Sequence, residues 1–340
     1  MQKGSIIGSS VVVMTIAMLF MSTGVDRVRS QAQAQEPKLI KISTARGIHH
    51  LSLWGVAPFA AKYGLKTEVI ATNTNAEMQR YAQTGEVQIA ALGYQSPAIM
   101  AEQGVATVKV IAGHYNAGQN LIMGKGVKFE SWKDLEGKKI GVPPGTYVGV
   151  LFLLAAKANN VDISKVNIVN ITPVGTVELQ ALKSGDLDGF VMWSPVIDRG
   201  VVDGYAVYPA CCDIGSTAKF GAGNQILGAN TEFLKDRAAV VNLLKAVVEA
   251  KEFYAKNPDK ALEVIAQYAG IDKAVLTEAL KRANWETRVD VEIAKNVAKE
   301  GPTFGFTKAD MSGKVESYFD LSYLSEATGK SIDALRSFTR

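Results

Sequence analysis

LIKIS at residues 39–43, KTEVIA at 66–71, VQIAAL at 87–92 and VKVIAG at 108–113 are the stretches that decide the fold. Each is a short run rich in aliphatic and β-branched residues, which favours a β-strand. The segments between them carry apolar residues at helical spacing and end near a glycine, a common signal for the end of a helix. This alternation predicts a mostly parallel sheet covered by helices on both faces.

The same alternation begins again in the middle of the chain. KIGV at 139–142, VNIVN at 166–170 and the segment 189–192 are predicted strands. The predicted helices of both units cover residues 52–62, 75–84, 96–103, 148–159, 176–184 and 194–201. From Thr231 onward the pattern is mainly amphipathic helix, which we expect to pack back on the first unit. The fold class is therefore α/β with two similar units.

The N-terminal segment has the pattern of an export signal. Lys3 precedes the apolar run VVVMTIAMLFM at 11–21, which is too short for a membrane span of about 20 residues. Ala32-Gln33-Ala34 is an A-x-A cleavage pattern, so residues 1–34 are the predicted signal peptide and the predicted location is the periplasm. An uncleaved membrane anchor is the alternative.

Composition and charge exclude several classes of protein. The hydrophobic content of 47% with 21% charged residues excludes a disordered chain. The net charge of +4 is too small for a nucleic-acid scaffold, so no nucleic-acid partner is expected. The two cysteines, Cys211 and Cys212, are adjacent, and we expect two buried thiols because a disulfide between neighbours is strained. Their redox state is left open.

Ligands of open parallel sheets bind beyond the carboxyl ends of the strands, at helix N-termini. The candidate binding residues at such positions are Gly47, His49, His50, Tyr94, Gln95, His114, Gly145, Thr146, Tyr147, Trp193 and Asn224. They include all three histidines of the chain. No Asp, Glu or Cys stands at metal-ligand spacing from the histidines, so neither a metal nor a cofactor is expected.

Each candidate has a structural alternative. Gly145 and Thr146 open a helix, where free N–H groups suit an anion, but Thr146 is also a good N-cap. His49 and His50 could donate hydrogen bonds to a ligand or form a surface loop pair. His114 could instead be a satisfied histidine packed on the strand end. The aromatic candidates Tyr94, Tyr147 and Trp193 could line a pocket or pack in the core, and Asn224 is the most weakly supported.

Longer segments carry a family resemblance. They are ARGIHHLSLWGVAPFAAKYGL, TGEVQIAALGYQSPAIMAEQG, SWKDLEGKKIGVPPGTYVGVLFLLAA, LQALKSGDLDGFVMWSPVI and NTEFLKDRAAVVNLLKAVVEAKEFYAKNP. In their order and spacing the chain resembles the periplasmic substrate-binding proteins of nitrate/sulfonate/taurine ABC importers. Binders of thiamine-pyrimidine precursors belong to the same fold group.

The resemblance implies a two-lobed, type II periplasmic binding protein with a hinge and a ligand cleft between the lobes. Lobe 1 would comprise residues 35–122 and 226–340, and lobe 2 residues 123–225. The hinge would lie near 120–125 and 221–228. The expected ligand is a small organic molecule, either anionic (sulfonate- or carboxylate-like) or aromatic. The expected protein partner is an inner-membrane permease with its cytoplasmic ATPase, and the binding protein itself is expected to be a monomer.

An enzymatic role is not expected. The chain has neither G-x-S-x-G nor H-E-x-x-H, and the only cysteines are the adjacent pair. Two alternatives stay open: a pyrimidine-precursor binding or metabolising protein of the same fold, and a periplasmic partner that presents a ligand to a membrane sensor. The identity of the ligand is open as well.

Overall fold

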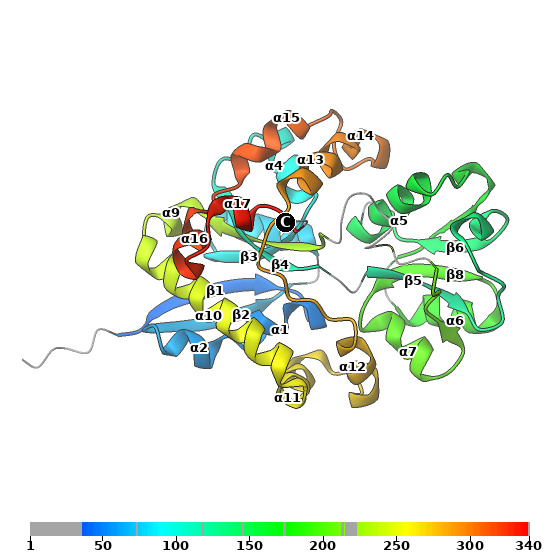
Figure 1. The fold of residues 1–340 in the computed structure, drawn as a ribbon, viewed down its shortest axis with the longest axis horizontal. Coiled ribbons are helices and arrows are strands. Elements are labelled where there is room, and N and C mark those ends of the chain that lie inside the picture. Colours follow the sequence, from blue (N-terminus) through cyan, green and yellow to red (C-terminus); the bar gives the residue numbers. More distant parts are fainter. Residues whose placement is uncertain are drawn as a thin grey trace, which may run out of the picture. The chain divides into compact units, whose positions relative to one another are not determined.

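A computed structural model describes residues 36–72, 74–116, 119–144, 146–172, 175–211, 214 and 223–338. Residues from Pro37 onward form one compact unit (Figure 1). The predicted signal peptide lies outside the described residues. Within the described part of the chain, no helix is both long and apolar enough to cross a membrane.

The first sheet contains the four strands that decided the fold. Its order is β2-β1-β3-β10-β4, with bounds β1 (Lys38–Thr44), β2 (Leu65–Ala71), β3 (Ile89–Gly93), β4 (Val108–Tyr115) and β10 (Gln225–Asn230). β1 runs parallel to β2 and β3, whereas β10 runs antiparallel between β3 and β4. β3 is buried at all five positions, as expected for a strand covered on both faces.

The second sheet has the order β7-β6-β8-β5-β9. Its strands are β5 (Gln119–Gly124), β6 (Lys139–Val142), β7 (Asn167–Asn170), β8 (Gly189–Trp193) and β9 (Ala206–Val207). β6 is parallel to β7 and β8, while β5 is antiparallel to β8 and β9. Both sheets are therefore mixed, and each contains an antiparallel strand that the alternation of strands and helices did not predict.

The two unpredicted antiparallel strands, β5 and β10, cover most of the two segments expected to form the hinge. Most of 120–125 lies in β5, and 225–228 lies in β10; residues 221 and 222 lie outside the described residues. The chain thus leaves the first sheet after Tyr115 and enters the second at Gln119. Strand hydrogen bonds hold both segments in their sheets.

The α-helices before β9 largely follow the prediction, whereas the short 3-10 helices η1, η2 and η3 were not predicted. These helices are η1 (Ile48–His50), α1 (Leu51–Trp54), α2 (Ala57–Ala61), α3 (Asn75–Thr84), α4 (Ser96–Gln103), η2 (Trp132–Leu135), α5 (Tyr147–Ala158), η3 (Ile163–Lys165), α6 (Thr176–Ser184) and α7 (Val196–Val202). α3 and α6 each end at a left-handed glycine, Gly85 and Gly185. The predicted helix 52–62 is interrupted at Gly55 and Val56.

The segment from Thr231 is helical, drawn from yellow to red in Figure 1. Its helices are α9 (Thr231–Leu234), α10 (Arg237–Lys256), α11 (Pro258–Ala269), α12 (Lys273–Leu280), α13 (Val291–Lys299), α14 (Gly301–Phe304), α15 (Ser312–Val315), η4 (Glu316–Tyr318), α16 (Ser322–Thr328) and α17 (Ile332–Leu335). α10 packs on α1, α2 and α16, and α13 packs on α4. These contacts place the helical segment against helices of the first unit, while α12 contacts α7, a helix of the second unit.

The expectation of buried thiols is wrong for Cys211. This residue is exposed and disulfide-bonded. It lies in a turn beyond β9 and not in the core. Burial therefore does not protect its thiol from oxidation. Cys212 lies outside the described residues.

Candidate functional site

The structure brings the three histidines of the chain together. His49 and His50 lie in η1, directly after β1, and His114 lies near the end of β4. His50 Nδ1 is 3.2 Å from His114 Nε2, and the two rings are nearly parallel at 5.3 Å. The His49 ring is 4.0 Å from that of His50. The alternative of a surface loop pair is wrong, because both residues are buried.

Burial keeps these imidazoles neutral. Desolvation lowers the pKa of His49 from 6.5 to about 4. It also lowers the pKa of His50 and of His114 well below the usual value, and nearby positive charges add to the effect. For His114 the main such charge is Lys251. At pH 7 each ring therefore has one donor nitrogen and one acceptor nitrogen.

Several buried polar atoms at this edge of the first sheet have no hydrogen-bond partner among the described residues. They are His50 Nε2, His114 Nδ1, Asn116 Oδ1, Ser43 Oγ, Thr44 Oγ1 and Ser52 Oγ. An unpaired buried polar group costs about 1–3 kcal/mol. Native proteins rarely leave such groups unpaired, so water or a ligand is expected to complete them. Two of these atoms belong to the contacting rings of His50 and His114, which marks the histidine cluster as the candidate binding site.

An extended segment, residues 284–290, lines the edge of β4 beside the cluster. Gly113 N donates to Thr287 O at 2.7 Å, and Asn116 N donates to Asn284 O at 2.9 Å. A Cβ atom on Gly113 would lie 1.9 Å from Arg288 O, so glycine is needed for this close approach. The segment also places the ring of Trp285 6.4 Å from that of Tyr115.

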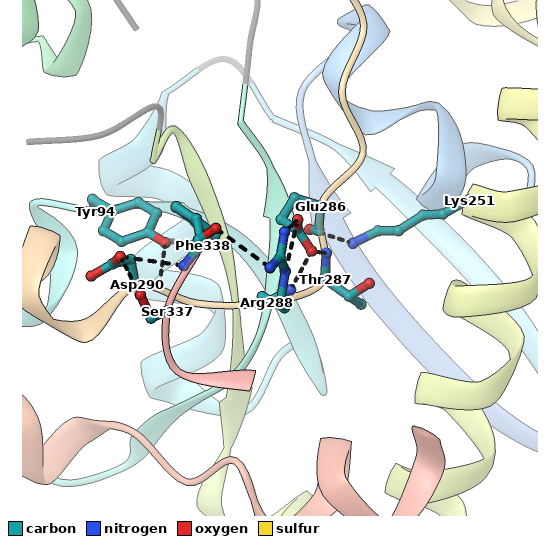
Figure 2. Close-up of polar contacts among 8 residues, drawn as sticks. All are labelled: Tyr94, Lys251, Glu286, Thr287, Arg288, Asp290, Ser337 and Phe338. Carbon is teal, nitrogen blue, oxygen red and sulfur yellow. Dashed lines mark hydrogen bonds and ion pairs between the residues drawn. The ribbon is translucent and has the colours of Figure 1, made fainter. Parts of the chain in front are cut away.

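Lys251 of α10 holds this segment against β4 through hydrogen bonds to both. Figure 2 shows its side chain reaching from the helix to the segment. Lys251 Nζ donates to Gly113 O and to Glu286 O, each at 3.0 Å. Burial lowers the pKa of Lys251 to about 7, opposed by the charge of Glu286. Lys251 thus connects the helix, the strand that carries His114 and the extended segment.

The far end of the segment is fixed by Asp290. Its backbone N–H donates to Tyr94 Oη at 3.2 Å (Figure 2). Its carboxylate accepts hydrogen bonds from Ser337 Oγ and Phe338 N. Tyr94 in turn stacks on Tyr147, with centroids 6.3 Å apart. The segment is therefore held at Lys251 and again at Tyr94.

The predicted aromatic residues pack mainly against protein. Tyr94 and Tyr147 are buried, and Tyr147 Oη donates to Gly223 O at 2.5 Å. Trp193 ends β8 and is half-buried against the core. Tyr94 directly follows β3, Trp193 ends β8, and Tyr147 begins α5.

The remaining predicted residues have different surroundings. Gln95 is buried and its Oε1 has no partner among the described residues, whereas Asn224 is buried and bonded. Thr146 caps α5: its hydroxyl accepts from Gly149 N at 3.3 Å and donates to Pro143 O at 2.8 Å. Gly145 lies outside the described residues.

Gly47 has a defined packing role. A Cβ atom there would lie 2.3 Å from His49 Cε1, which real contacts do not allow. Because the His49 ring is buried, Gly47→Ala is expected to displace it and to lower the free energy of unfolding by about 1–3 kcal/mol. Urea denaturation measures the change. Gly313→Ala is the matched control, since a Cβ atom there meets nothing within 4 Å. Equal effects of the two substitutions would contradict the prediction.

An ion pair between the buried Asp198 and the half-buried Arg282 joins the part of the chain that carries the second sheet to the C-terminal helices. Arg282, just after α12, donates from Nη2 to Asp198 Oδ1 on α7 at 2.7 Å. Asp198 is fully buried and also accepts from Tyr208 Oη at 2.7 Å. The Arg282 guanidinium lies over the Tyr208 ring at 3.8 Å. Burial raises the pKa of Tyr115, whose ring lies 5.7 Å from that of His49; the charge of Asp198 adds to the rise and that of Arg282 opposes it.

Sequence reasoning missed Lys251, Arg282, Asp198 and Trp285. Only Lys251 had a usable signal: it falls on the apolar stripe of α10, four residues after Val247 and three before Tyr254. A lysine at such a position must find buried partners. Among the described residues no group of three or more His, Cys, Asp or Glu could hold a metal ion.

Comparison with protein families gives one match that covers most of the chain. The family described as NMT1/THI5 like matches residues 59–261.

Curated relatives match more than half of the chain. A putative binding protein of Brucella abortus (strain 2308) is 30% identical over 203 residues, 56% of this chain and 60% of its own. The taurine-binding periplasmic protein of Escherichia coli (strain K12) is 27% identical over 204 residues, 59% of this chain and 61% of its own. The chain thus spans about three fifths of the length of the curated relatives that it matches.

Solved structures share the fold at low sequence identity. The aliphatic sulphonate binding protein SsuA from Escherichia coli superposes with a TM-score of 0.71 at 14% identity, covering 82% of this chain and 91% of its own. The nitrate-binding protein NrtA from Synechocystis PCC 6803 gives 0.69 at 14% identity, covering 89% and 92%. The desulfurization enzyme DSZB gives 0.64 at 15% identity, covering 86% and 99%. Identities this low establish the fold alone, and the family match to residues 59–261 shows that the chain belongs to the NMT1/THI5-like family.

Proposed function

We propose that this protein is the solute-binding component of an ABC importer, exported to the periplasm, which captures a small organic ligand without changing it chemically. The observation that carries the proposal is the buried histidine cluster, whose outer nitrogens have no partner among the described residues. The similarity of the chain to a taurine-binding protein and to a sulphonate-binding protein supports the same role.

The ligand is proposed to be a small organic molecule that is either anionic, with a sulfonate or carboxylate group, or aromatic. The cluster offers N–H donors and hydroxyls to such a group, and Tyr115 and Trp285 provide flat apolar faces nearby. His49, His50 and His114 would contact the ligand, while Gly47 holds His49 in place. The candidate contacts from the proposed second lobe, residues 123–225, are Thr146, Tyr147, Trp193 and Asn224.

Ligand capture would close two lobes, residues 35–122 with 226–340, and residues 123–225. Because contacts from both lobes exist only in the closed state, binding would shift the population toward closure. The closed protein would dock as a monomer on a membrane permease.

A thermal-shift screen tests the proposed function. Purified mature protein is heated with sulfonates, carboxylates, nitrate and pyrimidines, each at several concentrations. A ligand that binds only the native state raises Tm, by an amount that corresponds to about 2.7 kcal/mol at 100 times its Kd. We expect a saturable rise with a sulfonate or carboxylate and recovery of that compound unchanged. Product formation during the incubation would contradict the proposal and favour an enzyme.

A further inference from the structure

The contact between His50 and His114 couples the protons of the two rings. Their nitrogens are 3.2 Å apart, so one ring donates and the other accepts. If His50 Nδ1 donates, His114 carries its proton on Nδ1 and His50 Nε2 is an acceptor. If His114 Nε2 donates, both outer nitrogens reverse their roles. The neutral pair therefore always presents one donor and one acceptor at its outer ends.

One additional proton changes this pattern. With a proton shared between the rings and one on each outer nitrogen, both ends of the pair become donors. Two donors suit an anion with several oxygens, whereas the neutral pair presents a lone pair that repels it. Both outer nitrogens are buried and lack partners among the described residues, so each needs a polar partner that a ligand would supply.

Four charged or titratable residues lie around the pair, two on its own elements and two on other parts of the chain. His49 lies beside it in η1, Tyr115 follows in β4, Lys251 approaches from α10 and Glu286 from the extended segment. The charges of Asp198 and Arg282 act on Tyr115. The two cations are already engaged: Lys251 with two carbonyl groups, and Arg282 with Asp198 and Glu278.

We propose that the His50–His114 pair takes up one proton from solvent when an anionic ligand binds, so that the anion is held by an imidazolium pair rather than by a permanently charged side chain. This inference rests on the proposed solute-binding function. Without ligand, burial and the neighbouring Lys251 disfavour a charge on either ring. An anion in hydrogen-bond contact reverses that balance, because an opposite charge nearby favours the protonated ring.

Calorimetry counts the proton directly. Benzenesulfonate and benzoate are titrated into the wild-type protein at pH 7, in two buffers with different ionisation enthalpies. Benzenesulfonamide and benzamide are the matched neutral probes. We expect uptake of about one proton with a bound anion and none with a bound amide. Affinity for the anion should also fall by up to tenfold per pH unit above neutrality, as linkage of one proton requires.

Histidine signals identify where the proton goes. The chain has only three histidines, so a sample with labelled imidazole nitrogens and a histidine-free affinity tag gives only the signals of the cluster. We expect His50 and His114 to move to the protonated form on binding of benzenesulfonate. This measurement uses the wild-type protein and does not depend on the folding of a variant.

Substitutions distinguish the pair from Lys251, whose pKa is lowered by burial to about 7. Proton uptake should persist in Lys251→Met and be lost in His114→Gln. Loss in Lys251→Met with retention in His114→Gln would overturn the inference, as would anion binding without proton uptake or binding of the amides alone. Anion binding without proton uptake, and binding of the amides alone, are both still binding of a solute. These two results therefore leave the proposed function intact. A protein that binds no solute in the screen contradicts the proposed function and removes the inference with it.

Discussion

Acidification from pH 7 to pH 5 is expected to destabilise the unliganded protein by several kcal/mol. In the unfolded chain the histidines have their ordinary pKa of 6.5, whereas in the folded protein all three values are lowered, that of His49 to about 4. Below pH 6.5 the unfolded state therefore binds more protons, and stability falls as pH decreases. His49 alone contributes about 2 kcal/mol by pH 5, at about 1.4 kcal/mol per pH unit.

The pH range over which stability is lost distinguishes the histidines from other titratable groups. Above pH 6.5 the contribution of the histidines to the free energy of unfolding is constant. Lys251 acts in a different range: its pKa is lowered from 10.5 to about 7, so stability rises with pH between those values. Carboxylates whose pKa is lowered, such as Glu286, lose their contribution only below their ordinary value of 4.5.

Urea midpoints at pH 7, 6 and 5 measure the predicted loss. His49→Gln should flatten the decline by roughly a third, because it removes one of the three titrating rings while leaving His50 and His114 in contact. A midpoint that stays constant from pH 7 to pH 5 would show that the histidines are not held neutral by the fold.

Arg282→Ala is expected to reduce the free energy of unfolding by about 3–5 kcal/mol, because it leaves the fully buried Asp198 without its cation. The substitution also removes a direct bond between α7 and the region after α12. Chemical denaturation at pH 7 measures the loss.

An exposed ion pair supplies the matched control. Arg237 pairs with Glu326, and their side chains are 48% and 51% exposed, so Arg237→Ala should cost about 1 kcal/mol or less. Adding Asp198→Asn to Arg282→Ala should recover part of the loss, since it removes the uncompensated charge. An Arg282→Ala variant as stable as Arg237→Ala would mean that the pair contributes nothing.

The local elements were largely predictable. The limits of α4 and α6 and of β6 agree with those expected from the sequence, because periodicity, cap residues and glycine stops act over a few residues. β10 was missed since QILGAN is short and contains a glycine and an asparagine. Its strand character comes from pairing on both sides with β3 and β4, which only the fold supplies.

The candidate site was predictable in part. The position of the histidines after strands was visible because carboxyl ends of parallel strands meet at one edge. The pairing of His50 with His114, 64 residues apart, was not. The same holds for Arg282 and Asp198, which are separated by 84 residues and come from the turn after α12 and from α7, segments that no local pattern places together.

The sequence by itself determined the succession of strands and helices and the edge of the sheet at which polar residues gather, since both depend on local propensity and on strand direction. Only the tertiary structure decided which of those residues touch and in what state of charge. Packing of α10 and of residues 284–290 against β4 buries Lys251 and His114 side by side, and that burial, rather than any residue type, makes the imidazoles neutral.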